Sequence, residues 1–305
     1  MNQTGNVYGA VLHEYSTIFN RLNKIKSGIK NEFIHGGHLV SVASPALAIS
    51  TMILLGLSIR WEFIIITYLG TLCIYNYDYI KGLKMDYLEN VNRSKHIQKY
   101  QKLRILALIF YGIGFLSMLV YFGNVNSIVF GIALLIIGLA YTDIFKRFTK
   151  KIAGFKNLYT SISFSMLILF TPIYYSYPIN SLFLIFFIFV ILQFIVDTSF
   201  CDMKDLNSDK KNKFKTLPII FGKVNFLRFI LVINLISFVI LIISIHINIL
   251  PFFSIVLIPF FIYRMFYIIK AKKPQVNIIK LSALVDAEYF FWPLALFIGS
   301  LIITC

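Results

Sequence analysis

The sequence predicts an all-α membrane protein, a bundle of about nine transmembrane helices. Three observations support this fold class. The chain of 305 residues is 58% hydrophobic and only 14% charged, with a mean hydropathy of +0.79, whereas a soluble domain carries roughly 25% charged residues. Its apolar runs are continuous, as in residues 181–196, which favours helices over the alternating strands of a barrel. Its basic residues gather in every second loop.

Each predicted helix corresponds to an apolar run of about 20 residues, the length that crosses a bilayer. Gly and Pro mark the short turns between runs, as at Gly123 and Pro178. The predicted spans are 35–58, 61–80, 103–123, 126–144, 157–177, 180–200, 225–246, 248–268 and 281–304.

The distribution of basic residues predicts the topology. Of the 29 Lys and Arg, 27 lie in the N-terminal tail or in the loops after the second, fourth, sixth and eighth spans. By the positive-inside rule these segments are cytoplasmic. We therefore expect a cytoplasmic tail over residues 1–32, one polytopic domain over 33–305 in the cell membrane, and Cys305 outside. The net charge of +16 is interpreted as attraction for anionic lipid headgroups or substrates rather than for nucleic acid.

The acidic residues are few, and they cluster. Only 13 are present, and Asp202, Asp205 and Asp209 follow the sixth span while Asp78 and Asp86 lie at the end of the second. On one helix the first three fall within an arc of about 60°. Clustered carboxylates repel one another unless cations lie between them, and such oxygen ligands suit Mg²⁺, which commonly bridges to a substrate phosphate. Solvated loop acids that balance nearby lysines are the simpler interpretation.

A weak internal repeat relates the two acidic loops. A shift of 123 residues takes Asp86 to Asp209, Gly82 to Asp205 and Tyr141 to Arg264. This predicts two four-helix repeats plus one helix, with both acidic loops at a shared polar cap on the cytoplasmic side. The basic residue Arg93 follows the first acidic cluster, Lys215 follows the second, and Lys146 and Arg147 lie in the basic segment between the two. Acids and bases around one cavity are typical of a magnesium–diphosphate site.

Three segments resemble the UbiA superfamily of intramembrane prenyltransferases. DMKDLNSDKKNKFKTLPIIFG (202–222) resembles its second Asp-rich motif, with the following Thr-Leu-Pro. YNYDYIKGLKMDYLENVNR (75–93) resembles the first motif, and KRFTKKIAGFKNLY (146–159) the basic segment between them. The chain departs from the family pattern at Gly82, where a carboxylate is usual, at Asp78, where Asn is usual, and in the Tyr-x-x-x-Lys spacing, since Lys146 follows Tyr141 by five residues.

The resemblance implies a prenyltransferase that moves a prenyl group from a polyprenyl diphosphate to a hydrophobic acceptor, which could be an aromatic compound, a quinone precursor or a lipid. It implies that Mg²⁺ is held by Asp78, Asp86, Asp202, Asp205 and Asp209. It also implies that Arg93, Lys146, Arg147 and Lys215 bind the diphosphate, and that Tyr141 belongs to the catalytic group with Arg93, Lys146 and Arg147.

Two other functions stay open at this point. A terpene cyclase of the UbiA type would use the same metal site, with the allylic cation attacked by the substrate's own double bonds. A transporter would explain the helices without the acidic clusters, and it would need ionisable residues at mid-depth. Arg228, Asp286 and Glu288 are the candidates inside the late spans.

Overall fold

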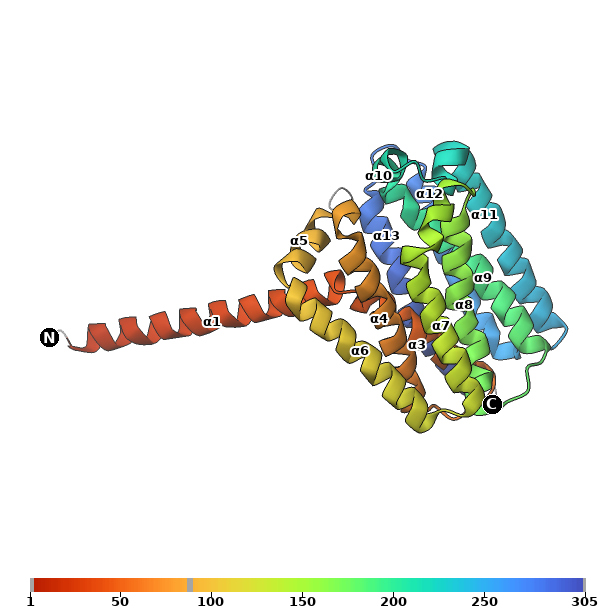
Figure 1. Cartoon of the computed structure of the whole chain (residues 1–305), viewed down its shortest axis with the longest axis horizontal. Coiled ribbons are helices and arrows are strands. Elements are labelled where there is room, and N and C mark those ends of the chain that lie inside the picture. The colour runs from red at the N-terminus through yellow and green to blue at the C-terminus, as the bar shows by residue number, and fades with distance from the viewer. Residues whose placement is uncertain (1–2, 87–89, 304–305) are drawn as a thin grey trace.

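The fold is a bundle of helices, as Figure 1 shows, from which the first helix projects. The computed structural model describes residues 3–86 and 90–303, with side chains from residue 19 onward apart from 84–86 and 283. All regular structure in these residues is helical, which confirms that the fold is all-α. The helices are α1 (Gln3–His35), α2 (His38–Ser41), α3 (Ala43–Leu54), α4 (Trp61–Asp86), α5 (Val91–Lys99), α6 (Gln101–Phe122), α7 (Val125–Asp143), η1 (Phe145–Lys150), α8 (Phe155–Tyr175), α9 (Ser181–Cys201), η2 (Asp202–Lys204), α10 (Leu206–Lys211), α11 (Leu217–His246), η3 (Phe252–Leu257), α12 (Ile258–Ala271), α13 (Ile278–Ala287), η4 (Glu288–Phe290) and α14 (Phe291–Ile303).

Seven segments of the described chain are long and apolar enough to cross a membrane. They coincide with the last seven predicted spans, from α6 (Gln101–Phe122) to the segment Ile278–Ile303. The first predicted span is different, because the chain bends by 56° between Phe19–His35 and His38–Leu54. Gly37 lies in this bend with a φ of 89°, a conformation that favours glycine. The second predicted span is the continuous helix α4, which carries more polar residues and is not among the seven.

Local signals explain where the spanning helices begin. Asn124 and Asn180 are the N-cap residues of α7 and α9, and their side chains accept hydrogen bonds from the backbone N–H groups of Ser127 and Leu182. Pro218 lies at the start of α11, where a proline costs no hydrogen bond. These caps define where the helices begin, which their uniformly apolar sequences alone do not.

Consecutive long helices pack side by side, and the last one returns to the first part of the bundle. α4 packs on α6 and α7, α8 on α7 and α9, α9 on α11, and α14 on α3. One core lies around Phe63, Phe170 and Trp292, and a second lies between α9, α11 and α12 around Phe200 and Tyr267. Bulky apolar side chains on α6, α7 and α11 stay exposed, which marks them as lipid-facing.

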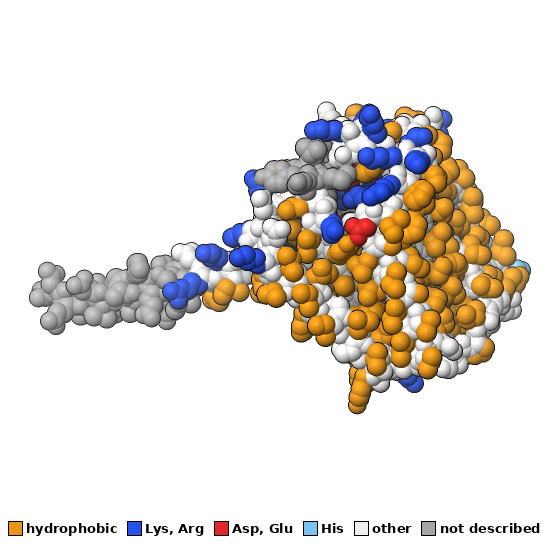
Figure 2. All heavy atoms as spheres, viewed as in Figure 1, with side chains coloured by type: hydrophobic (Ala, Val, Ile, Leu, Met, Phe, Trp, Pro, Cys, Tyr) orange, Lys and Arg blue, Asp and Glu red, His pale blue; other side chains and the backbone are white. Residues whose placement is uncertain are grey.

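The surface divides into an apolar belt and a polar cap. Figure 2 shows apolar side chains over the body and Lys and Arg side chains gathered at its upper end. The cap contains η1, α10 and the end of α4, while Arg60 lies at the opposite end of α4 against Tyr175. The bundle therefore presents one strongly basic end, as the loop pattern predicts.

Candidate functional site

A cavity of about 650 Å³ lies between α3, α4, α7, α8, α9 and α13. Its inner wall is apolar, with Phe130, Leu134, Phe164, Leu167 and Phe170. Its other end, towards the cap, carries polar side chains, which among the described residues include Asp78, Arg93, Tyr141, Lys146, Lys156, Asp202, Lys204, Asp205, Asp209 and Asp286. The cavity can therefore hold a molecule with an anionic head and an apolar tail.

The first acidic cluster contributes Asp78 from helix α4. Its carboxylate accepts a hydrogen bond of 2.9 Å from Thr142 Oγ1 and lies 3.8 Å from Lys146 Nζ. These contacts join α4 to the end of α7 and to η1. Asp86 is the last residue of α4, eight positions and about 12 Å further along the helix. The side chain of Asp86 lies outside the described residues, so its predicted metal role stays a prediction.

The second cluster lines the cavity from two short helical elements, η2 and α10, and from the residue between them. Asp202 and Asp209 are each 2% exposed, and Asp205 is half-buried between them. The chain is not one helix here: α9 ends at Cys201, η2 follows, and α10 begins at Leu206. The arc calculated for a single helix therefore does not apply, yet all three carboxylates line the cavity.

Asp202 is held by two side chains of helix α8. Its Oδ1 accepts a hydrogen bond of 2.6 Å from Lys156 Nζ, and its Oδ2 accepts one of 2.8 Å from Asn157 Nδ2. Both donors come from the first turn of α8, which follows Gly154 at a φ of 65°. This turn brings Lys156 from the basic segment into the cavity wall.

Four cations line the cavity among the described side chains, and two of them, Arg93 and Lys146, are predicted diphosphate ligands. Arg93, on α5, lies 4.3 Å from the centre of the Tyr79 ring, a cation–π geometry that fixes its guanidinium beside the cavity. Lys146 lies beside Asp78. Lys156 and Lys204 are additional, and the sequence analysis treats both only as loop charges. The position of Lys156 directly after the Ala-Gly-Phe turn is the signal that could have placed it.

Arg147 and Lys215 are not among the side chains that line this cavity in the described chain. Arg147 is exposed and faces a separate surface hollow with Asp143 and Phe148. The reason is the 3₁₀ geometry of η1, in which residues three apart share a face, so that Lys146 and Thr149 point inward. Lys215 is also exposed, and its Nζ donates a hydrogen bond of 3.2 Å to the Lys151 carbonyl.

Tyr141 lies in the cavity wall at the end of α7. The centroid of its ring is 5.1 Å from that of Tyr159 on α8. The two rings lie where the polar lining of the cavity changes to the apolar lining. Tyr141 and Lys146 are five positions apart, and both line the cavity because α7 ends and η1 begins between them.

The donor set suits a hydrated cation bound together with a phosphate. Among the described side chains, no three His, Cys, Asp or Glu residues come close enough to form a complete metal cage. Mg²⁺ does not need one, since it keeps several waters and binds through one or two carboxylates plus substrate phosphates. Asp78, Asp202, Asp205 and Asp209 on one cavity end therefore fit Mg²⁺.

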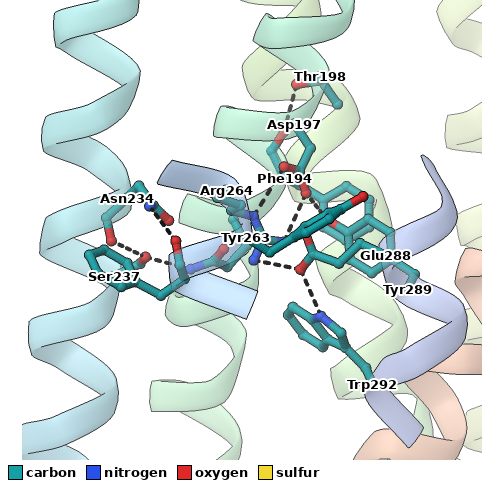
Figure 3. A network of polar contacts seen from close by, with 12 residues as sticks. Phe194, Asp197, Thr198, Asn234, Ser237, Tyr263, Arg264, Glu288, Tyr289 and Trp292 are labelled. Atoms are coloured by element: carbon teal, nitrogen blue, oxygen red, sulfur yellow. Dashed lines mark hydrogen bonds and ion pairs between the residues drawn. The ribbon is translucent and has the colours of Figure 1, made fainter. Parts of the chain in front are cut away.

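Figure 3 shows a buried ionic network, one member of which, Asp197, belongs to the cavity lining. Asp197, on α9, lines the cavity and accepts hydrogen bonds from Arg264 and Tyr267, the latter at 2.6 Å. Arg264 Nη1 lies 2.7 Å from Glu288 Oε1, which also accepts a hydrogen bond of 2.9 Å from Trp292 Nε1. The network ties α9 to α12 and to the C-terminal segment. The sequence analysis does not include Asp197 in the site.

The fold and the cavity define a class of intramembrane enzyme, and comparison with known proteins gives the family. A family model described as the UbiA prenyltransferase family matches residues 92–295. This match covers about two thirds of the chain, and the protein therefore belongs to the UbiA prenyltransferase family. A search of curated protein sequences finds no significant match.

Solved structures share the fold at low sequence identity. An apo UbiA homologue from Aeropyrum pernix K1 is 12% identical with a TM-score of 0.65, over 88% of this chain and 98% of that one. A UbiA homologue from Archaeoglobus fulgidus bound to GPP and Mg²⁺ is 14% identical with a TM-score of 0.63, over 87% and 99%. A digeranylgeranylglyceryl phosphate synthase is 16% identical with a TM-score of 0.58, over 89% and 98%.

Proposed function

We propose that this protein transfers a prenyl group from a polyprenyl diphosphate to a hydrophobic acceptor, with Mg²⁺ as cofactor. The observation that carries the proposal is the single cavity, which joins an end lined by carboxylates and cations to an apolar interior. A prenyl diphosphate has the same two parts. The Archaeoglobus fulgidus homologue with this fold is bound to GPP and Mg²⁺, which supports the same ligand class here.

The proposed metal ligands are Asp78, Asp86, Asp202, Asp205 and Asp209. The proposed diphosphate ligands are Arg93 and Lys146, joined by Lys156 and Lys204, which line the same end of the cavity. Bound Mg²⁺ supplies charge stabilisation to the leaving diphosphate. Lys146 and Lys156, which pair with Asp78 and Asp202 in the structure, are proposed to bind the diphosphate oxygens. Arg147 and Lys215 are left out of this set because their side chains face outward.

The apolar part of the cavity is proposed to hold the prenyl chain. Along α8 the cavity lining runs from Lys156 at the polar end to Phe170 in the apolar part, 14 residues apart, which corresponds to about 21 Å at 1.5 Å per residue. The buried walls exclude water, which would otherwise capture the allylic cation as an alcohol. Tyr141 and Tyr159 border the start of this region, and their ring faces are suited to stabilise a nearby cation.

The membrane orientation is part of the proposal. The basic end of the bundle is proposed to face the cytoplasm, because 27 of the 29 Lys and Arg lie in the tail and the four loops at this end. A water-soluble diphosphate head would then enter from the cytoplasm, and the acceptor, an aromatic compound, a quinone precursor or a lipid, would reach the cavity from the bilayer.

The test is product identification with purified protein. The protein is incubated with Mg²⁺, a labelled prenyl diphosphate of defined length and a membrane lipid extract, and products are identified by mass. We expect diphosphate release and a prenylated acceptor, both abolished by EDTA and in an Asp202→Asn/Asp209→Asn variant. A cyclic hydrocarbon formed without acceptor would instead show a cyclase. No turnover across chain lengths and extracts would contradict the proposal.

A further inference from the structure

Helix α1 projects from the bundle and has no partner along most of its described length. It runs over Gln3–His35, 33 residues, or about 50 Å at 1.5 Å per residue. Figure 1 shows that only its C-terminal end meets the body, where it packs on α2 and α5. The sequence analysis interprets residues 1–32 as a polar tail, yet a helix of this length needs a surface to stabilise it.

One face of α1 is apolar and exposed. Five bulky side chains, each 39–66% exposed, recur every three or four residues: Phe19, Leu22, Ile25, Ile29 and Phe33. At 100° per residue they span an arc of about 120°. The helix is therefore amphipathic although its overall composition is polar, which is the pattern of helices that lie in a membrane interface.

The other residues of this segment carry uncompensated positive charge. Arg21, Lys24, Lys26 and Lys30 are all exposed, and residues 19–31 include no acid. Lys26 and Lys30 lie at one edge of the apolar arc, whereas Arg21 and Lys24 lie beyond it. Long basic side chains at such positions extend towards headgroups while their stems cover apolar surface. Four cations without acids would also oppose pairing of two α1 helices from different copies.

The junction of α1 with the body sets its level relative to the membrane. Glu32, near the end of α1, lies 2.5 Å from Arg104 Nη2 and 2.9 Å from His96 Nε2. Arg104 is in the first turn of α6, at the cap end of a membrane-spanning helix. Arg104 also donates a hydrogen bond of 3.1 Å to the Gly36 carbonyl. These bonds hold α1 where the apolar belt meets the basic cap, the region that Figure 2 shows at the base of the projecting helix.

We propose that α1 is an interfacial helix that lies along the bilayer surface on the cap side, with its apolar face among the acyl chains and its basic residues on anionic phospholipid headgroups. Apolar burial and charge act together, because each basic residue near an anionic surface adds to the attraction for the membrane. The helix thereby extends the membrane contact of the protein on the side where the polar end of the cavity opens. This inference is independent of the proposed reaction.

The experiment uses the full chain with its three cysteines replaced by alanine, carrying one fluorophore-labelled cysteine at a time. Ile25→Cys probes the apolar face, and Ser27→Cys, also exposed and about 160° away from Ile25 around the helix, is the matched control. Each is reconstituted into phosphatidylcholine vesicles with or without phosphatidylglycerol and with brominated lipids as quenchers. We expect a blue-shifted, several-fold more strongly quenched signal at Ile25→Cys than at Ser27→Cys, and stronger quenching with phosphatidylglycerol.

A second variant isolates the charge. Replacing Arg21, Lys24, Lys26 and Lys30 together with Gln in the Ile25→Cys background is expected to remove the phosphatidylglycerol dependence while α4 to α14 stay folded, as judged by an unchanged thermal midpoint. Equal, water-like fluorescence at Ile25→Cys and Ser27→Cys would overturn the proposal. A second result would also overturn the proposal. It is an Ile25→Cys signal that changes with protein density, through energy transfer between copies, but is not quenched by brominated lipid. That result would show that two α1 helices from different copies pair with each other.

Discussion

Arg264 and Asp197 form a bidentate ion pair inside the helical bundle. Arg264 Nε lies 3.1 Å from Asp197 Oδ1, and Nη2 lies 3.0 Å from Oδ2. The two residues are 67 positions apart in the chain and only 1% and 3% exposed. Because Asp197 precedes Asp202 by five residues on the same segment, the pair holds α9 where it delivers the second acidic cluster to the cavity.

The first prediction concerns this pair. Arg264→Leu leaves Asp197 and Glu288 buried without their shared cation, and removing one member of a buried pair costs about 3–5 kcal/mol. We expect a strongly lowered thermal unfolding midpoint in detergent, whereas Lys272→Gln, an exposed cation on the turn after α12, leaves it unchanged. Equal midpoints for Arg264→Leu and wild type would show that the network does not stabilise the fold.

The second prediction concerns the acidic clusters. Asp205→Ala or Asp209→Ala is expected to lower turnover at least about 100-fold, the effect typical of removing one electrostatic group from an active site, while membrane insertion is retained. Asp143→Asn is the matched control, because Asp143 is exposed and pairs with Lys81 at 3.6 Å outside the cavity. Diphosphate release is the readout. Near-wild-type rates in both alanine variants would show that Asp205 and Asp209 are ordinary loop charges and not part of the active site.

The third prediction separates two cations that the sequence does not distinguish. Lys156 contacts Asp202 in the cavity, whereas Arg147 faces the outer hollow. Lys156→Gln is expected to raise the KM for the prenyl diphosphate and to lower kcat, because one leaving-group contact is lost. Arg147→Gln is expected to behave like wild type. If Arg147→Gln impaired the reaction and Lys156→Gln did not, Arg147 would belong to the site and Lys156 would not.

The fourth prediction is the orientation of the bundle. Single cysteines at Lys211, in the cap, and at Asn248, at the opposite end of α11, are labelled in intact cells with a membrane-impermeant reagent. We expect Asn248→Cys to react from outside and Lys211→Cys only after permeabilisation, as the positive-inside rule requires. Labelling of Lys211→Cys in intact cells would place the cap outside and invert the topology.

The sequence predicts the spanning helices well because each long apolar run is a strong local signal. It does not reveal α1, since an amphipathic helix of polar composition has no such run. The sequence correctly brings Asp202, Asp205 and Asp209 together but treats them as part of one helix. The helix break after Cys201 is missed because no glycine or proline marks it in the sequence. Arg264 and Asp197 could not be paired in advance, since their contact depends on how α9 and α12 pack rather than on any local pattern.

The last prediction concerns the altered first motif, where Gly82 replaces the usual carboxylate. Two accounts compete: either Asp78 has taken over this role, or the metal held by the motif is weakly bound. Asp78 faces the cavity beside Lys146, and on a helix Gly82 lies about 40° from both Asp78 and Asp86.

We expect compensation by Asp78, tested by Mg²⁺ titration of activity. Asp78→Asn should then need more Mg²⁺ for half-maximal rate. Gly82→Asp should give no gain, because a third carboxylate at close range crowds like charges in a buried position. Asp143→Asn serves as the control for a change of charge outside the cavity. If Asp78→Asn titrates like wild type while Gly82→Asp shifts strongly to lower Mg²⁺, the weak-metal account holds, and Asp86 rather than Asp78 is the carboxylate that completes the site.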